Sequence, residues 1–254
     1  MNTPARTQKT FGLIIIGDEL LLGSRQDRHL AYFRELLKQR GKRLVCCWFL
    51  SDETESLTHH LRFSIDQDRP AFVCGGIGAT PDDVTRACAA RAAGVELFRH
   101  PGAAALIEAK FAASAYPERI HMADLPAGSQ LIPNPYNQIP GFSLQQHYFL
   151  PGFPQMAWPM AQWVLDTYYP QPSDQPPRLL KEQSLRVHAT PESTLIPLMR
   201  KLTERFRDMK MFSLPHLGSE KYVELGFRGE GDIATAMEAL KSALQAKGID
   251  YSDP

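Results

Sequence analysis

The chain has 254 residues, 43% of them hydrophobic, and its 28 basic residues balance its 28 acidic ones. This length suits one large domain or two modest ones, and the apolar content excludes a disordered chain. The neutral balance argues against nucleic acid and membrane surfaces as partners, and no segment is apolar enough to span a bilayer. Four cysteines without a Cys-x-x-Cys spacing argue against structural zinc and favour reduced thiols in a cytoplasmic protein.

Short apolar runs alternate with helical patterns in the first part of the chain. The polar residues 1–10 are predicted to be disordered, and apolar runs at 11–16, 43–50 and 71–74 predict buried strands. Helices are predicted from residue 30 to the stop at Gly41, from 51 to 65, and from 81 to 93. This order predicts a parallel sheet with helices on both faces, which is a three-layer α/β domain.

The pattern continues beyond residue 93 and then breaks. A helix is predicted at 101–115, a short strand near 132, a turn-rich loop at 134–142, a strand at 147–150 and a helix ending at 169, so that the first domain covers 11–169. The proline-rich residues 170–178 predict a linker. Strands at 183–188 and 223–228 and helices at 192–206 and 233–247 then predict a small α+β domain over 179–254.

Residues 71–85, AFVCGGIGATPDDVT, combine a predicted strand, a glycine loop and a helix start. Thr80 has the character of an N-cap, Pro81 suits the first helical position, and Asp82 and Asp83 would lie in the first turn. Such a unit gathers backbone N–H groups around one point, where anions bind. Arg86 and Arg91 follow on the same helix, either as phosphate partners or as solvated charges.

The two aspartates of this loop allow two interpretations. They would repel a bare phosphate, but they can hold a divalent cation that phosphate oxygens also bind. Alternatively, Asp82 and Asp83 only complement the helix dipole. The local pattern leaves both interpretations open.

The predicted sheet adds information about where these acids lie. Ligands of parallel α/β sheets bind beyond the carboxyl ends of the strands. Three such ends would bring together Asp18 with Glu19, Asp52 with Glu53, and the glycine loop. Three acidic strand ends at one edge predict a metal-assisted site.

Four motifs occur in an order that matches a known family: GDELLLG at 17–23, GGIGATPDDVT at 75–85, NPYNQIPGF at 134–142 and LPGFPQM at 150–156. The chain resembles the N-terminal part of the competence/damage-inducible CinA proteins. That part is similar to the molybdenum-cofactor biosynthesis domain of the MoaB/Mog type. The residues after the predicted linker resemble the KH-like domain of CinA proteins, although no Gly-x-x-Gly loop for RNA is evident.

The resemblance implies an α/β fold that binds a molybdopterin or a dinucleotide, in a homodimer. Some members are metal-dependent pyrophosphohydrolases acting on ADP-ribose or FAD, for which Mg, Mn or Co would be the divalent metal. Matched by motif and strand end, the expected catalytic residues are Asp52 and Asp83, and the expected metal ligands are Glu19, Asp52, Asp82 and Asp83. The expected phosphate- or ligand-binding residues are Gly75, Gly76, Gly78, Thr80, Asp18, Asp27, Asn134, Pro151 and Gly152.

The chain departs from the family pattern at the expected cleft. It has Asp27-Arg28-His29 where Asn-Thr-Asn is common, Asn137 in place of a glycine, and Met156 in place of a glutamate. Three functions are therefore left open. They are metal-dependent hydrolysis of a nucleotide pyrophosphate, pterin or nucleotide binding without turnover, and transfer of AMP to molybdopterin.

Overall fold

The computed structural model describes residues 10–170, 181–218 and 220–254 of the chain. The chain forms two compact units, Met1–Pro177 and Arg178–Pro254. The predicted disordered terminus (1–10) and the predicted linker (170–178) lie outside the described residues, except for Thr10, which begins the first strand, and Pro170.

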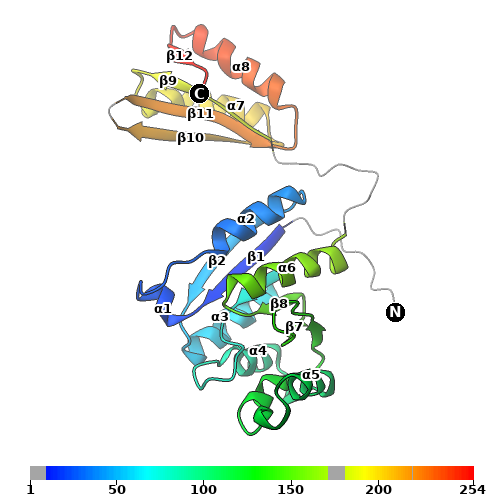
Figure 1. Cartoon of the computed structure of the whole chain (residues 1–254). Helices are drawn as coiled ribbons and strands as arrows, with labels where there is room; N and C mark the ends of the chain where they lie inside the picture. The colour runs from blue at the N-terminus through cyan, green and yellow to red at the C-terminus, as the bar shows by residue number, and fades with distance from the viewer. Residues whose placement is uncertain (1–9, 171–180, 219) are drawn as a thin grey trace. The chain divides into compact units, whose positions relative to one another are not determined.

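The first unit is an α/β domain built around one mixed sheet (Figure 1). Its elements are β1 (Thr10–Ile16), α1 (Asp18–Leu21), α2 (His29–Gln39), β2 (Arg43–Leu50), α3 (Thr54–Asp66), β3 (Ala71–Cys74), α4 (Thr85–Ala93), β4 (Leu97–Arg99), α5 (Pro101–Phe111), η1 (Ala112–Ala115), η2 (Arg119–Ala123), β5 (Asp124–Pro126), β6 (Gln130–Ile132), β7 (Gly141–Leu144), β8 (His147–Leu150) and α6 (Pro154–Tyr168). The sheet order is β2-β1-β3-β8-β7-β6, and β4 pairs with β5 separately.

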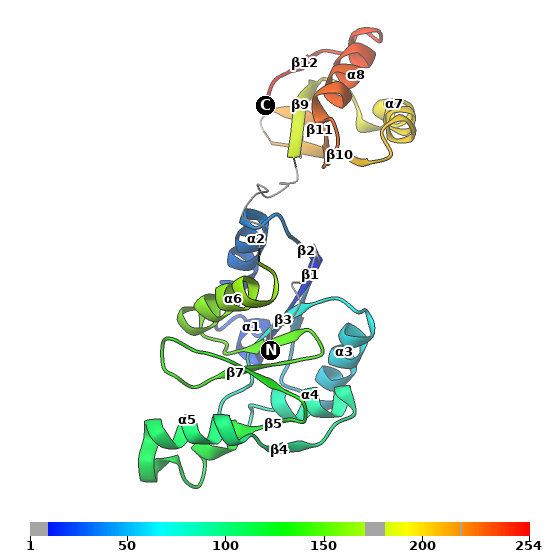
Figure 2. The ribbon, with the colours of Figure 1, turned by 90° about the vertical axis from the view of Figure 1, so that its right-hand side faces the viewer.

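The four strands from β2 to β8 are parallel, whereas β7 and β6 continue the sheet in antiparallel fashion. Helices cover both faces, as Figures 1 and 2 show. In β1, Phe11, Leu13 and Ile15 pack with α2 and α6, while Ile14 and Ile16 pack with α3 and α4. A strand that is buried on both faces has a continuous run of apolar residues in its sequence. The predicted three-layer, mostly parallel fold is confirmed.

The second unit has its own antiparallel sheet and its own core. Its elements are β9 (Lys181–His188), α7 (Glu192–Arg205), β10 (Met209–Leu217), β11 (Lys221–Gly229), α8 (Ile233–Gln245) and β12 (Tyr251–Ser252), in the sheet order β10-β11-β9-β12. The predicted β-α-β-α order was incomplete because it lacked β10 and β12. Since β10 is an edge strand, it tolerates Pro215 and polar residues that a central strand excludes. The KH-like assignment of this unit stays a prediction.

Two further features concern the whole chain. The four cysteines are free thiols, of which Cys74 and Cys88 are buried. None of the helices in the described ranges is both long and apolar enough to cross a bilayer. The cytoplasmic location expected from the sequence stays a prediction.

Candidate functional site

The loop after β3 depends on two glycines that no other residue can replace without strain. Gly75 and Gly76 adopt φ angles of +116° and +65°. A Cβ atom at Gly75 would overlap the backbone carbonyl oxygen of Ile16, at the end of the neighbouring β1. The N–H of Gly75 donates to the carbonyl of Leu150 at 3.0 Å, at the end of β8. The loop therefore leaves the sheet with bare backbone pressed between two strand ends.

The helix after this loop begins four residues later than the sequence predicted. Helix α4 starts at Thr85, so Thr80 is not its N-cap and the acids are not in its first turn. Oδ2 of Asp83 accepts hydrogen bonds from the backbone N–H and the hydroxyl of Thr80, at 2.9 and 2.5 Å. The N–H of Asp83 in turn donates to the carbonyl of Thr80 at 3.0 Å. These bonds close a turn that competes with the helix, and they remove the first-turn explanation for Asp82 and Asp83.

Both candidate arginines of α4 bind groups of the protein itself. Arg86 is buried, and its guanidinium donates to the carbonyls of Gly78, at 2.6 Å, and of His121. It therefore anchors the glycine loop to η2. Arg91 forms an exposed ion pair with Glu55 at 2.7 Å.

Two of the predicted acids bind each other's backbone at the ends of β1 and β2. The N–H of Asp18 donates to Oδ2 of Asp52 at 3.1 Å, and the N–H of Asp52 donates to Oδ1 of Asp18 at 3.3 Å. Glu19 lies beside them and forms an ion pair with Arg25 at 3.5 Å. Burial and the nearby charges of Asp18, Glu19 and Asp82 raise the pKa of Asp52, although the N–H of Asp18 offsets part of this.

The glycine loop and most of the predicted acids line one cavity of about 470 Å³. The predicted residues that line it are Glu19, Asp52, Gly75, Gly76, Gly78, Thr80, Asp82, Asp83, Asn134, Pro151 and Gly152. Asp18 lies outside the lining and holds Asp52 through the backbone bonds described above. The three strand ends thus meet at one edge, as the sequence predicted.

Asn134 gives this cavity a buried donor. Its side chain is 4% exposed, and its Oδ1 accepts the N–H of Tyr136 at 3.0 Å. Its Nδ2 finds no hydrogen-bond partner among the described residues. A buried, unpaired N–H donor beside a bare glycine loop suits a ligand that presents acceptor oxygens.

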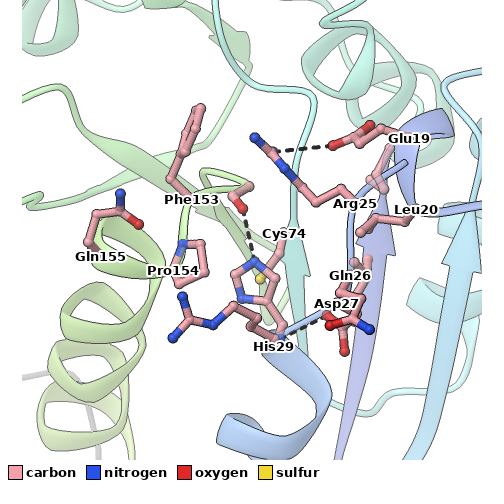
Figure 3. A pocket seen from close by; sticks show the side chains of 14 residues that line it. Glu19, Leu20, Arg25, Gln26, Asp27, His29, Cys74, Phe153, Pro154 and Gln155 are labelled. Carbon is pink, nitrogen blue, oxygen red and sulfur yellow. Dashed lines mark hydrogen bonds and ion pairs between the residues drawn. The ribbon is translucent and has the colours of Figure 1, made fainter. Parts of the chain in front are cut away.

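Asp27 lies apart from the other predicted acids. Its two carboxylate oxygens accept the backbone N–H groups of His29 and Leu30, at 2.8 and 3.0 Å, and so cap the start of α2. It lines a smaller, adjacent cavity of about 300 Å³ (Figure 3). The resemblance placed Asp27 among the expected ligand-binding residues by its position after the GDELLLG motif, and that match does not reveal that its carboxylate caps a helix.

Arg25 and Phe153 also border both cavities, and the sequence analysis did not identify them. The guanidinium carbon of Arg25 lies 5.4 Å from the centre of the Phe153 ring. The two residues are 128 positions apart, a separation at which no periodic pattern could reveal a contact. The pairing of β1 with β3 and of β3 with β8 brings their loops to the same edge.

The donor set fits an open site for a hard cation. No group of three or more His, Cys, Asp or Glu side chains within the described ranges is placed to hold a metal by itself. Magnesium, however, commonly takes one or two carboxylates and completes its shell with phosphate oxygens and water. Asp52, among other carboxylates that raise its pKa, supplies such an oxygen at the cavity wall. A bound cation would offset the repulsion among these acids.

Residues 12–171 match the protein family described as "Probable molybdopterin binding domain". A protein of Pyrobaculum aerophilum is 27% identical over 75% of this chain and 73% of its own length. A CinA-like protein of a Geobacter species is 29% identical over 74% of this chain, but the match spans 46% of that longer protein.

The solved structure of "the protein CinA with unknown function" from Thermoplasma acidophilum superposes with a TM-score of 0.58 at 25% identity, over 62% of this chain and 96% of that one. This match agrees with the mostly parallel sheet of the first unit. The family of the first unit follows from the match over 12–171. The fold and the curated relatives named CinA-like agree with this match. The chain belongs to the family of probable molybdopterin-binding domains, and its curated relatives include proteins named CinA-like.

Proposed function

We propose that this protein binds the pyrophosphate of a nucleotide in the larger cavity and hydrolyses it with a divalent cation. ADP-ribose and FAD are the first substrates to test. The observation that carries the proposal is Asp52, a half-buried carboxylate with a raised pKa on the wall of a cavity formed by bare glycine backbone. A site that combines backbone N–H donors for phosphate with carboxylate oxygens for a hard cation suits metal-assisted phosphoryl chemistry.

Each residue has a role in this proposal. The backbone from Gly76 to Gly78 and the Nδ2 of Asn134 would receive phosphate oxygens, while the N–H of Gly75 stays bonded to Leu150. Asp52 and Asp82 would hold the cation, and Glu19 lies close enough to Asp52 to affect its pKa. A bound divalent cation supplies Lewis-acid polarisation of a phosphoryl oxygen and helps to ionise water. Asp83 orients Thr80 and thereby shapes the loop around the phosphate.

AMP release from ADP-ribose or FAD tests this proposal. We expect the full chain to release AMP with Mg²⁺, Mn²⁺ or Co²⁺, and chelation by EDTA to reduce the rate by at least about 100-fold, because the protein alone offers too little charge stabilisation. Chromatography of the nucleotides measures the rate. Binding without AMP release under any of the three metals would contradict hydrolysis.

Binding without turnover is the second candidate function, and one contact favours it. Asn137 Nδ2 lies 3.5 Å from Sδ of Met156 at the rim of the larger cavity. Two of the residues that depart from the family pattern therefore occupy the rim together, where neither offers a carboxylate. A rise of the melting temperature with ADP-ribose or molybdopterin, combined with no AMP release, would support this function.

The pH dependence of AMP release is expected to depend on the metal concentration. Asp52 must lose its proton to hold a cation, and its raised pKa places that step above the ordinary aspartate value of about 3.9. Activity at subsaturating Mn²⁺ should therefore fall on the acid side at a pH above this value. More Mn²⁺ should shift the fall to lower pH, because metal and proton compete for the same carboxylate. An acid limb that does not move with Mn²⁺ would exclude Asp52 as a ligand.

A further inference from the structure

The smaller cavity adjoins the larger one and shares part of its wall. Ile16, Glu19, Arg25, Gly152 and Phe153 line both. Arg25 lies over the Phe153 ring and ion-pairs with Glu19, so these side chains mark where the two cavities meet (Figure 3). A ligand with its phosphates in the larger cavity can extend past this point into the smaller one.

His29 presents an unsatisfied acceptor to the smaller cavity. The residue is 3% exposed, and its Nε2 lies 3.0 Å from the carbonyl oxygen of Gly152. A carbonyl can only accept, so Nε2 carries a proton. Burial lowers the pKa of His29, which favours the neutral ring, and Nδ1 then has a lone pair and no proton. Nδ1 has no hydrogen-bond partner among the described residues.

The nearby carboxylate of Asp27 does not satisfy this atom. Both of its oxygens accept backbone N–H groups at the start of α2 rather than a ring nitrogen. The remaining wall includes Ile15, Leu20 and Pro154, which offer apolar surface to a flat ring. A lone pair repels phosphate, so the atom that reaches Nδ1 must be an N–H or O–H donor.

We propose that the smaller cavity is a second ligand subsite, in which His29 Nδ1 accepts a hydrogen bond from the base or ribose end of the nucleotide. The placement of the phosphates in the larger cavity rests on the proposed function. The two unpaired buried groups are complementary: Asn134 donates in the larger cavity and His29 accepts in the smaller one. A ligand with acceptor oxygens at one end and a donor at the other would satisfy both.

Two variants of His29 test the roles of its two ring nitrogens separately. In His29→Gln the amide nitrogen takes the approximate position of Nε2 and keeps the bond to Gly152, but the acceptor at Nδ1 is lost. In His29→Asn the amide oxygen takes the approximate position of Nδ1 and keeps that acceptor. We expect His29→Gln to weaken ADP-ribose binding by about tenfold, and His29→Asn to weaken it less. Inorganic pyrophosphate, which reaches only the larger cavity, should bind both variants as it binds the unmodified chain.

Ligand analogues identify the donor and do not depend on the variants folding. AMP is compared with purine riboside monophosphate, which lacks the amino group, and with 2′,3′-dideoxy-AMP, which lacks the ribose hydroxyls. The analogue that lacks the donor should bind the unmodified chain about tenfold more weakly than AMP does. It should bind the unmodified chain and the His29→Gln variant with equal affinity. Calorimetry measures the affinities. Equal binding of all three nucleotides, or of ADP-ribose to the unmodified chain and His29→Gln, would overturn the second subsite.

The test of the second subsite can fail independently of the test of hydrolysis. A His29 effect on ADP-ribose binding without AMP release would retain the subsite and reject the hydrolase. AMP release with no His29 effect would reject the subsite and retain the hydrolase. If ADP-ribose and pyrophosphate both fail to bind, both proposals are wrong.

Discussion

Gly76→Ala is expected to lower the free energy of unfolding by at least about 3 kcal/mol and to abolish nucleotide binding, while Gly94→Ala should cost about 1 kcal/mol. Both glycines are left-handed, with φ of +65° at Gly76 and +68° at Gly94. They therefore share the conformational penalty of a Cβ at positive φ. They differ in what that Cβ would meet.

The surroundings of Gly76 leave no room for a methyl group. A Cβ there would overlap Oγ1 of Thr85 and lie 3.2 Å from its Cβ, whereas a Cβ at Gly94 has no atom within 4 Å. Thr85 is fully buried and its N–H donates to the carbonyl of Gly76 at 3.0 Å, so it cannot move aside without losing this bond. Urea unfolding of the two variants measures the difference. Equal losses would show that the loop accommodates a side chain and is not a bare-backbone cradle.

Asp52→Asn is expected to reduce metal-dependent AMP release by at least about 100-fold, because the amide cannot serve as an anionic ligand. The exposed Asp66→Asn, at the last position of α3, is the matched control and should retain full activity. Assays at several Mn²⁺ concentrations separate weaker metal binding from slower turnover. Full activity of Asp52→Asn would exclude this carboxylate from the chemistry.

The same variant should be at least as stable as the unmodified chain when metal is absent. The pKa of Asp52 is raised on folding, so the folded state binds its proton more tightly than the unfolded chain does. Stability therefore falls as pH rises between the unfolded and the folded pKa values, and ionised Asp52 is a destabilising group at neutral pH. Its neutral replacement removes that penalty. Melting curves in EDTA measure this, and a large fall in Tm would show that the carboxylate is structural.

The sheet was predictable because its central strands are buried on both faces. The runs at 11–16 and 71–74 are apolar and almost wholly buried. The run at 43–50 is an apolar edge strand that is only partly buried, and the order of the three strands places three loops at one edge. The short strand predicted near 132 is β6, whereas β7 was missed because its first residues belong to the turn-rich segment 134–142, which resembles a loop.

The start of α4 was predicted wrongly, and the helix-capping role of Asp27 was missed, for a common reason. Short polar side chains can bind several nearby backbone N–H groups, and sequence alone does not say which. Asp83 binds back to Thr80, and Asp27 binds forward to His29 and Leu30. The orientation of His29 was also beyond prediction, because its partner Gly152 is 123 positions away.

The reciprocal bonds between Asp18 and Asp52 have a consequence for variation among homologues. Each carboxylate fixes the other residue's main chain, so a residue without a side-chain acceptor at either position frees an amide at its neighbour. Because the two bonds hold the same pair of strand ends together, losing one should weaken the other, so the double replacement should be milder than the sum of the single ones. In a family tree, we expect these two acids to be inherited or lost together.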